Sequence, residues 1–312
     1  MQISGTLIED TYAEAFTMRA ARLVITAADG RWATVAARTM TGFATSVIGC
    51  GCEAGLEGPA PGRTPDGRAG VRVLVFARSA TDLQDQLMRR VGQCVMTAAG
   101  TACFDDLSSE ETVRVGSLLR FFGDGHQVSK VMDAALLAAG GAGTPASRER
   151  RFWRIPVMDG EFVVEDRFGV RKAVAGGNFL ILGRTPEVTL MAAERAVEAI
   201  RKVPGVILPF PGGIVRSGSR VGSKYKKLIA STNSPYCPTL RRSVKTALPD
   251  DVGCVLEIVA DGLTLDDVRR AMAAGIRAAC GDGIVRISAG NYGGKLGKHL
   301  VHLRPLLNET TA

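Results

Sequence analysis

The sequence has little histidine and few aromatic residues. Only His126, His299 and His302 are present among its 312 residues, and Phe, Tyr and Trp together make up 5%. Zinc sites need clustered Cys or His ligands, and the one close pair, Cys50 and Cys52, has no second pair to complete such a cluster. The seven cysteines are odd in number and scattered, which is typical of reduced thiols. We therefore expect no metal site and no disulfide framework.

Long apolar runs are also missing. No stretch of about 18 apolar residues occurs, so the sequence predicts no membrane-spanning helix. The first ten residues, MQISGTLIED, lack the basic and apolar regions of a signal peptide. With 46% hydrophobic and 22% charged residues, the composition is that of a globular chain. We expect a cytoplasmic protein that does not associate with membranes.

No nucleotide-binding motif is intact. A P-loop requires GxxxxGK followed by Ser or Thr, and residues 218–224 (GSRVGSK) place Ser223 between the glycine and the lysine. Residues 292–299 (YGGKLGKH) have Tyr in place of the first glycine and end on His. Residues 49–55 (GCGCEAG) begin as a dinucleotide fingerprint, but the third glycine is one position late. A GxSxG nucleophile elbow between a strand and a helix is absent as well.

The chain carries an excess of positive charge. Lys and Arg number 39 against 31 Asp and Glu, a formal net charge of +8. Part of the excess gathers in one cluster, Arg216, Arg220, Lys224, Lys226 and Lys227. RNA-binding sheets need aromatic side chains on which bases stack, and their scarcity disfavours nucleic acid as a partner. A solvated face, a small anionic ligand and an acidic partner protein all remain compatible with the cluster.

The two halves of the chain resemble each other. A segment rich in Gly, Ala, Pro, Ser and Arg between residues 140 and 151 separates them. Each half has the order strand, helix, strand, strand, helix, strand, which is the ferredoxin-like pattern. The sequence therefore predicts an α+β protein of two duplicated ferredoxin-like lobes, residues 1–150 and 151–312, each an antiparallel sheet with helices on one face.

Apolar spacing locates the principal elements. Strands are expected at residues 70–77 and 253–260, and helices near residues 32–38 and 187–202. Capping boxes at Thr81 with Gln84 and at Thr264 with Asp267 would start two further helices. Residues 115–122 are expected to form hairpin material, and a short helix is expected after Gln127. The stripes expected to be buried on the helices are Leu83, Leu87 and Val91; Leu190, Ala193, Val197 and Ile200; and Val268, Met272 and Ile276.

Glu257 is the residue that physical chemistry singles out. It is the one charged side chain in the apolar run CVLEIV, and strand alternation places it on the same face as Val255 and Val259. Burial among valines would raise the pKa of the carboxyl and favour its neutral, hydrogen-donating form. Such a group can serve as a general acid or an oxyanion donor. The alternative, which the sequence alone favours slightly, is a strand whose Glu side faces water.

Two polar loops are candidate walls of a site. Residues 231–239 (STNSPYCPT) form a polar segment fixed by two prolines, and residues 288–295 (SAGNYGGK) offer backbone amide donors with little side-chain bulk. Plain turns are equally compatible with both segments.

Eight stretches, in order, carry a family resemblance. They are IEDTYAEAF, TGFATSVI, GQCVMTA, FFGDG, GEFVVED, PFPGGIV, ASTN with YCPT, and SAGNYGGKLG. Over essentially its full length the chain resembles formylmethanofuran:tetrahydromethanopterin formyltransferases. The resemblance implies two related α+β lobes, no metal and no permanently bound cofactor. It also implies that Glu257 is the catalytic glutamate, which reverses the weight given above to the solvent-facing alternative.

The resemblance further implies where substrates bind. The loops at Asn233 and Tyr236 and at Asn291, Tyr292 and Lys295 are expected to belong to the substrate cleft. The carrier substrates would be methanofuran and tetrahydromethanopterin, or a dephospho analogue of the latter. The basic cluster from Arg216 to Lys227 would suit methanofuran, whose side chain carries glutamyl carboxylates.

The implied reaction is reversible transfer of a formyl group between two nitrogens through a tetrahedral intermediate. The resemblance extends to the bacterial formyltransferase/hydrolase complex, in which a metal-dependent amidohydrolase subunit releases formate. The expected partners are therefore further copies of this chain and the other subunits of such a complex. The alternative is a non-catalytic scaffold subunit of that complex that retains the transferase fold.

Overall fold

The computed structural model describes residues 1–62, 64–120, 124–132 and 150–309. These residues form two compact units. Unit 1 comprises Met1–Thr17 and Val174–Ala312, and unit 2 comprises Met18–Ala173. Strands β3 (Tyr12–Thr26) and β12 (Arg171–Gly183) each contain a boundary between the units. The compact units therefore differ from the sequence halves 1–150 and 151–312, because β3 and β12 each start in one unit and end in the other.

Unit 2 has the strand order of a ferredoxin-like sheet. Strand β3 lies between β6 (Ala102–Asp105) and β5 (Gly70–Ala77), and β4 (Glu53–Pro59) pairs with the other edge of β5, all antiparallel. Three strands extend the sheet: β10 (Gly160–Glu165) pairs parallel with β6, followed by β9 (Arg150–Val157) and β8 (Val128–Met132). A separate pair joins β7 (Thr112–Arg114) to β11 (Arg167–Gly169).

Unit 1 repeats the same order. Strand β12 lies between β17 (Ile284–Ser288) and β16 (Cys254–Gly262), and β13 (Val206–Ile207) pairs with the far edge of β16. Short strands extend it: β2 (Thr6–Ile8) pairs with β17, and β1 (Gln2–Ile3) pairs with β2. Strand β18 (His299–His302) pairs with the first residues of β3. The predicted α+β fold of two ferredoxin-like lobes is confirmed.

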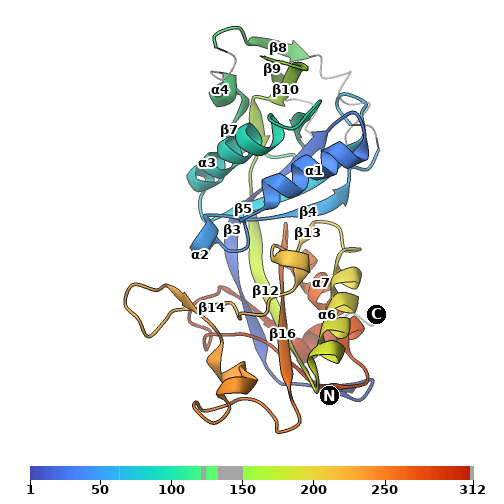
Figure 1. Ribbon diagram of the computed structural model, residues 1–312, viewed down its shortest axis with the longest axis vertical. Coiled ribbons are helices and arrows are strands. Elements are labelled where there is room, and N and C mark those ends of the chain that lie inside the picture. Colours follow the sequence, from blue (N-terminus) through green and yellow to red (C-terminus); the bar gives the residue numbers. More distant parts are fainter. Residues whose placement is uncertain (63, 121–123, 133–149, 310–312) are drawn as a thin grey trace. The chain divides into compact units, whose positions relative to one another are not determined.

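Helices cover one face of each sheet. In unit 2 these are α1 (Gly30–Thr41) and α3 (Ala80–Arg90), with the short α2 (Val47–Cys50) and α4 (Gly116–Leu119). In unit 1 they are α6 (Pro186–Ile200) and α7 (Leu265–Ala279), followed by α8 (Leu303–Glu309). The buried side chains of α6 and α7 pack against Phe179, Ile181 and Ile258 of the sheet. The opposite face of this sheet is covered by the long connection between β13 and β16, residues 208–253 (Figure 1).

The predicted capping box of α7 is confirmed. The Thr264 hydroxyl accepts the Asp267 N–H, and Asp267 accepts the Thr264 N–H. The box predicted at Thr81 is wrong, because α3 begins earlier in the chain. Its N-cap is Ser79, whose hydroxyl accepts the Asp82 N–H at 3.1 Å.

Three smaller expectations also change. Leu190 is 45% exposed, because the buried stripe of α6 consists mostly of smaller residues, Thr189, Ala192 and Ala196 among them. Residues 116–119 form helix α4 rather than hairpin material. The helix expected after Gln127 is wrong for Val128–Met132, which form strand β8. The rest of that segment and residues 140–149 lie outside the described residues.

Candidate active site around Glu257

Glu257 lies in the middle of β16, on the sheet face away from the helices. Ile258 and Ala260 point into the helix-covered core, so alternation sends Glu257 toward the connection 208–253. On one side Glu257 pairs with Leu180 of β12. On its other side the Glu257 carbonyl accepts the Val215 N–H at 2.8 Å, and the Glu257 N–H donates to the Val215 carbonyl at 2.9 Å. Both neighbours fix the backbone that carries the carboxyl.

The Glu257 carboxyl is buried, and only one of its two oxygens has a hydrogen-bond partner among the described residues. The residue is 4% exposed, and its Oε1 accepts the Ser219 hydroxyl at 2.6 Å. Its Oε2 is buried and has no hydrogen-bond partner among the described residues. Burial raises the pKa of Glu257 to about 7, against the lowering effect of the hydrogen bonds from Ser219. Because Oε1 already accepts, the proton of the neutral form belongs on Oε2, where it can be donated.

A small cavity of about 30 Å³ lies beside this carboxyl, and the predicted loop 231–239 contributes to its wall. Asn233 and Tyr236 line the cavity together with Glu257 and Arg216. The Tyr236 hydroxyl lies 3.3 Å from the Ser288 Oγ, which ties the loop to the end of β17. Gly218 has φ +74°, and a Cβ there would lie 2.7 Å from the Asn233 nitrogen. The two segments can therefore approach this closely only with glycine at position 218.

Tyr292 reaches the same site through hydrogen bonds rather than through the cavity wall. Its hydroxyl accepts the Val221 N–H at 2.7 Å and donates to the Ser219 carbonyl at 3.2 Å. Burial raises the pKa of this phenol. Tyr292 therefore holds in place the segment whose Ser219 hydroxyl contacts Glu257.

Glu14 organises the loop that carries Tyr292, a role that was not predicted from the sequence. Its carboxylate is 1% exposed. Oε1 accepts the N–H groups of Tyr292 and Gly294 at 2.6 Å each, and Oε2 accepts those of Leu296 and Gly297 at 3.1 and 2.8 Å. Although burial opposes it, these four donors lower the pKa of Glu14. The buried Glu14 carboxylate thus anchors the loop of Tyr292, and Tyr292 in turn holds the segment whose Ser219 contacts Glu257.

The remaining predicted residues lie further from the carboxyl. The Asn291 side chain donates to the Thr11 hydroxyl and to the Tyr12 carbonyl, both at 3.2 Å. Lys295 is exposed and does not line the cavity. The structure thus brings Asn233, Tyr236 and Tyr292 to the Glu257 site. It gives Asn291 a role in holding the loop and assigns Lys295 no contact with the site.

The basic cluster lies mostly on a hairpin next to the site. Strands β14 (Arg220–Val221) and β15 (Ala230–Ser231) form this hairpin (Figure 1). Lys224, Lys226 and Lys227 lie between the two strands and are exposed. Tyr225, Leu228 and Ile229 are 59%, 56% and 60% exposed between and beside the lysines. The cluster is therefore a basic surface interspersed with apolar side chains.

The described part of the chain contains no group of three or more His, Cys, Asp or Glu side chains placed to hold a metal ion. Among its helices, none combines the length and the apolarity needed to cross a bilayer.

The fold and this site define a class: a duplicated α+β protein with a buried, readily protonated carboxyl beside a small cavity lined by both polar and apolar residues. Comparison with known proteins specifies the family. Residues 1–157 match the family model "Formylmethanofuran-tetrahydromethanopterin formyltransferase", and residues 160–306 match the model of its proximal lobe. The chain belongs to this formyltransferase family and is a transferase.

Relatives match over nearly the whole chain. The formylmethanofuran–tetrahydromethanopterin formyltransferase of Methylococcus capsulatus is 53% identical, over 98% of this chain and 100% of that protein. A component of the formyltransferase/hydrolase complex of Methylorubrum extorquens is 49% identical, over 99% of this chain and 98% of that protein. The crystal structure of that complex with methylofuran superposes with a TM-score of 0.91, covering 98% of both chains. The Methanosarcina barkeri formyltransferase superposes with a TM-score of 0.87 at 46% identity, covering 98% of this chain and 100% of that one.

Proposed function

We propose that this chain transfers the formyl group between methanofuran and tetrahydromethanopterin with Glu257 as the proton donor to the oxyanion. The observation that carries the proposal is the buried Glu257 Oε2, which has no partner among the described residues while Ser219 occupies Oε1. Glu257 also lines the small cavity. Buried polar atoms are rarely left unpaired. A group whose pKa lies near 7 is suited to proton transfer at neutral pH.

In this mechanism the nucleophile comes from the substrates. The ring amine of the pterin attacks the carbonyl carbon of the formamide, a new C–N bond forms, and negative charge moves to the carbonyl oxygen. The Glu257 Oε2–H donates its proton to that oxygen, which stabilises the tetrahedral intermediate. When the intermediate collapses the proton returns to Oε2. The bond to the leaving nitrogen breaks, and that nitrogen gains the proton that the attacking nitrogen loses.

The remaining residues of the site act by positioning. Ser219 keeps Oε1 occupied, and Tyr292 and Glu14 hold the segments around Ser219. Asn233 and Tyr236 form a wall against which the substrates bind. Alignment of two bound reactants is a large part of the rate enhancement in such a reaction.

Substitution of Glu257 tests the proposal. In Glu257→Gln an amide can still donate a hydrogen bond but cannot transfer a proton, so we expect kcat to fall by about 10²-fold or more. Glu257→Ala should fall at least as far. Glu161→Gln is the matched control, because Glu161 is exposed in unit 2 and paired with Arg154. Formyl transfer is followed by absorbance with formylated pterin and methanofuran. A folded Glu257→Ala protein with full activity would remove Glu257 from the mechanism.

The same assay distinguishes a transferase from the alternative, a non-catalytic scaffold subunit. A scaffold would show no transfer in any variant, whereas a transferase loses it selectively at Glu257.

We also propose that the chain works in an assembly, as a homo-oligomer together with hydrolase subunits that include an amidohydrolase. The Methylorubrum extorquens relative is a subunit of a formyltransferase/hydrolase complex, which supports the proposal. The basic hairpin, with its exposed lysines, would receive a glutamyl tail of methanofuran or an acidic partner subunit. Isolation of the tagged chain from its own cells tests this: recovery without any amidohydrolase would contradict it. Charge reversal at Lys224, Lys226 and Lys227 tests the hairpin. If it left the KM for methanofuran unchanged, the hairpin would not bind the glutamyl tail.

A further inference from the structure

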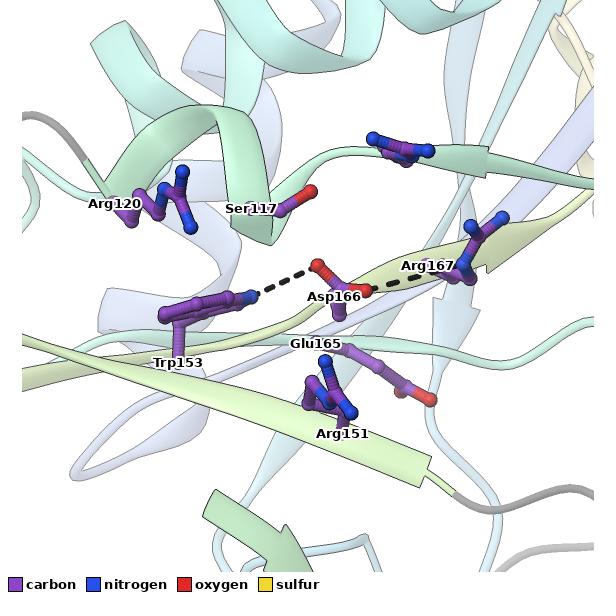
Figure 2. Close-up of a pocket in the computed structure, with 8 residues that line it drawn as sticks. Ser117, Arg120, Arg151, Trp153, Glu165, Asp166 and Arg167 are labelled. Atoms are coloured by element: carbon purple, nitrogen blue, oxygen red, sulfur yellow. Dashed lines mark hydrogen bonds and ion pairs between the residues drawn. The ribbon is translucent and has the colours of Figure 1, made fainter. Parts of the chain in front are cut away.

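Unit 2 contains a pocket of its own, of about 520 Å³. Four arginines line it, Arg114, Arg120, Arg151 and Arg167, together with Trp153 and Ser117. Figure 2 shows Arg120 above the indole of Trp153, with Ser117 on the neighbouring turn of α4. The Arg120 guanidinium carbon lies 5.4 Å from the centre of the indole. The volume falls within the range of small-molecule sites.

Strand alternation builds the wall of this pocket. Along β9, Arg150 and Phe152 are buried, whereas Arg151 and Trp153 point to the other side and line the pocket. Helix α4 closes over the strand end because position 116 is glycine, where a Cβ would lie 2.6 Å from the Glu165 carbonyl oxygen. The arginines are therefore brought together by the fold itself.

The pocket retains an excess of positive charge. Its two carboxylates are already engaged: Glu165 forms an ion pair with the buried Arg150 at 2.5 Å. The Asp166 Oδ1 accepts the Trp153 N–H at 2.8 Å, and its Oδ2 lies 3.9 Å from Arg167. The lining therefore carries four guanidiniums and two carboxylates, and one of these carboxylates, Glu165, is already neutralised by Arg150 outside the lining. Among the described residues no acidic side chain lies within ion-pair distance of Arg114 or Arg151.

A second, independent observation points to a ligand. The Ser117 Oγ is buried, yet it has no hydrogen-bond partner in the described part of the chain. A buried hydroxyl without a partner costs free energy unless something else satisfies it. Ser117 is one of the residues that line the pocket with the four arginines.

We propose that this pocket binds a small polyvalent anion that carries two or more carboxylate or phosphate groups. Guanidinium groups present paired N–H donors that match the oxygens of either group. A single acetate-sized anion would engage Arg114 or Arg151 alone, whereas a di- or trianion can contact both. The Ser117 hydroxyl adds a neutral donor. Every residue of this site belongs to unit 2, while Glu257 belongs to unit 1, so the inference goes beyond formyl transfer.

Tryptophan fluorescence tests binding directly. The chain has two tryptophans, Trp32 and Trp153, so Trp32→Phe leaves Trp153 as the sole reporter within the pocket. In the full-length protein at low ionic strength we expect a saturable fluorescence change with tricarballylate or pyrophosphate, and a Kd at least tenfold lower than that for acetate. The tighter of the two polyanions identifies carboxylate or phosphate as the physiological group. If neither polyanion gave a saturable response, or if acetate bound as tightly as the polyanions, the proposal would be overturned.

Variants then assign the binding to the pocket. Arg114→Ala with Arg151→Ala should weaken polyanion binding about 10- to 100-fold, since two charge-assisted contacts are lost. Ser117→Ala should weaken it several-fold. Arg154→Ala is the matched control, because Arg154 lies on the same strand but pairs with Glu161 and does not line the pocket. Equal weakening by Arg154→Ala would contradict the site, and so would loss of formyl transfer in the double variant, which would place these arginines in the transferase machinery.

Discussion

At the scale of single residues, the Glu257 carboxyl predicts how activity depends on pH. Its neutral form is the one that donates, and burial raises the pKa of Glu257 to about 7. We therefore expect kcat to fall as the pH rises through about 7, because the proton on Oε2 is lost. Glu257→Gln carries no such proton, so its residual activity should lack this limb. The pH profiles of the two proteins, measured with saturating substrates, check the prediction.

The same carboxyl affects stability. The folded-state pKa of about 7 lies above the ordinary 4.5, so between these values the native state holds a proton that the unfolded state has lost. Stability from this group therefore falls as pH rises from about 4.5 to about 7. At pH 8 Glu257→Gln should be more stable than the parent, by up to about 3 kcal/mol. Below pH 4 the difference should vanish, as thermal unfolding of both proteins would show.

Glu14 is predicted to set the order of the loop after β17. In Glu14→Gln the amide nitrogen can no longer accept, so two of the four N–H groups that Glu14 now binds lose their acceptor. We expect a loss of about 2–5 kcal/mol in local stability. Faster amide exchange at Tyr292, Gly294, Leu296 and Gly297 is the measurement. Unchanged exchange there would contradict the anchoring role.

The site was only partly predictable at this scale. Glu257 is recognisable because a lone charge in an apolar strand must either face water or be buried at a cost. Glu14 shows a similar signal, an acidic residue between Ala13 and Ala15 of β3, but its four donors come from a loop some 280 residues later. Ser219 is one serine in a polar segment, and only the tertiary fold brings it to Glu257. Long-range hydrogen bonds of this kind leave no local pattern.

At the scale of elements, the start of α3 offers a direct comparison. Ser79 caps the helix, whereas Thr81 is the second helical residue. Ser79→Ala should therefore destabilise the protein by about 1 kcal/mol. Thr81→Ala should change stability by less than about 0.5 kcal/mol, since no cap is lost. Chemical denaturation of both variants decides which residue begins the helix.

The predictions of elements were correct where the sequence pattern is long and wrong where it is short. The stripe of Val268, Met272 and Ile276 and the capping box of α7 were confirmed, because several spacings agree. Ser79, Thr81 and their partners three residues on are each compatible with a box, so sequence alone does not fix the start of α3. In α6 the small residues Ala192 and Ala196 lie inward in place of Leu190, since two closely packed helices leave little room there.

At the scale of the whole molecule, the division into units predicts which fragments fold. Residues 18–173 contain every strand of unit 2, so this fragment should give a cooperative unfolding transition. Residues 1–150 include seventeen residues whose unit lies elsewhere and lack β10, together with all but the first residue of β9. We expect that fragment to aggregate or to remain partly unfolded. Circular dichroism and denaturation of both fragments test the prediction, and cooperative folding of 1–150 would refute it.

The swapped ends of β3 and β12 also determine the order of events during synthesis. The first seventeen residues leave the ribosome at the outset, but their partners, among them β17 and β18, are made last. Unit 2 is complete once residue 173 has emerged, so it can fold while translation continues. The loop that Glu14 anchors, and with it the arrangement around Glu257, can form only after the chain is nearly finished. A ribosome-bound nascent chain therefore carries a folded unit 2 long before it carries a working active site.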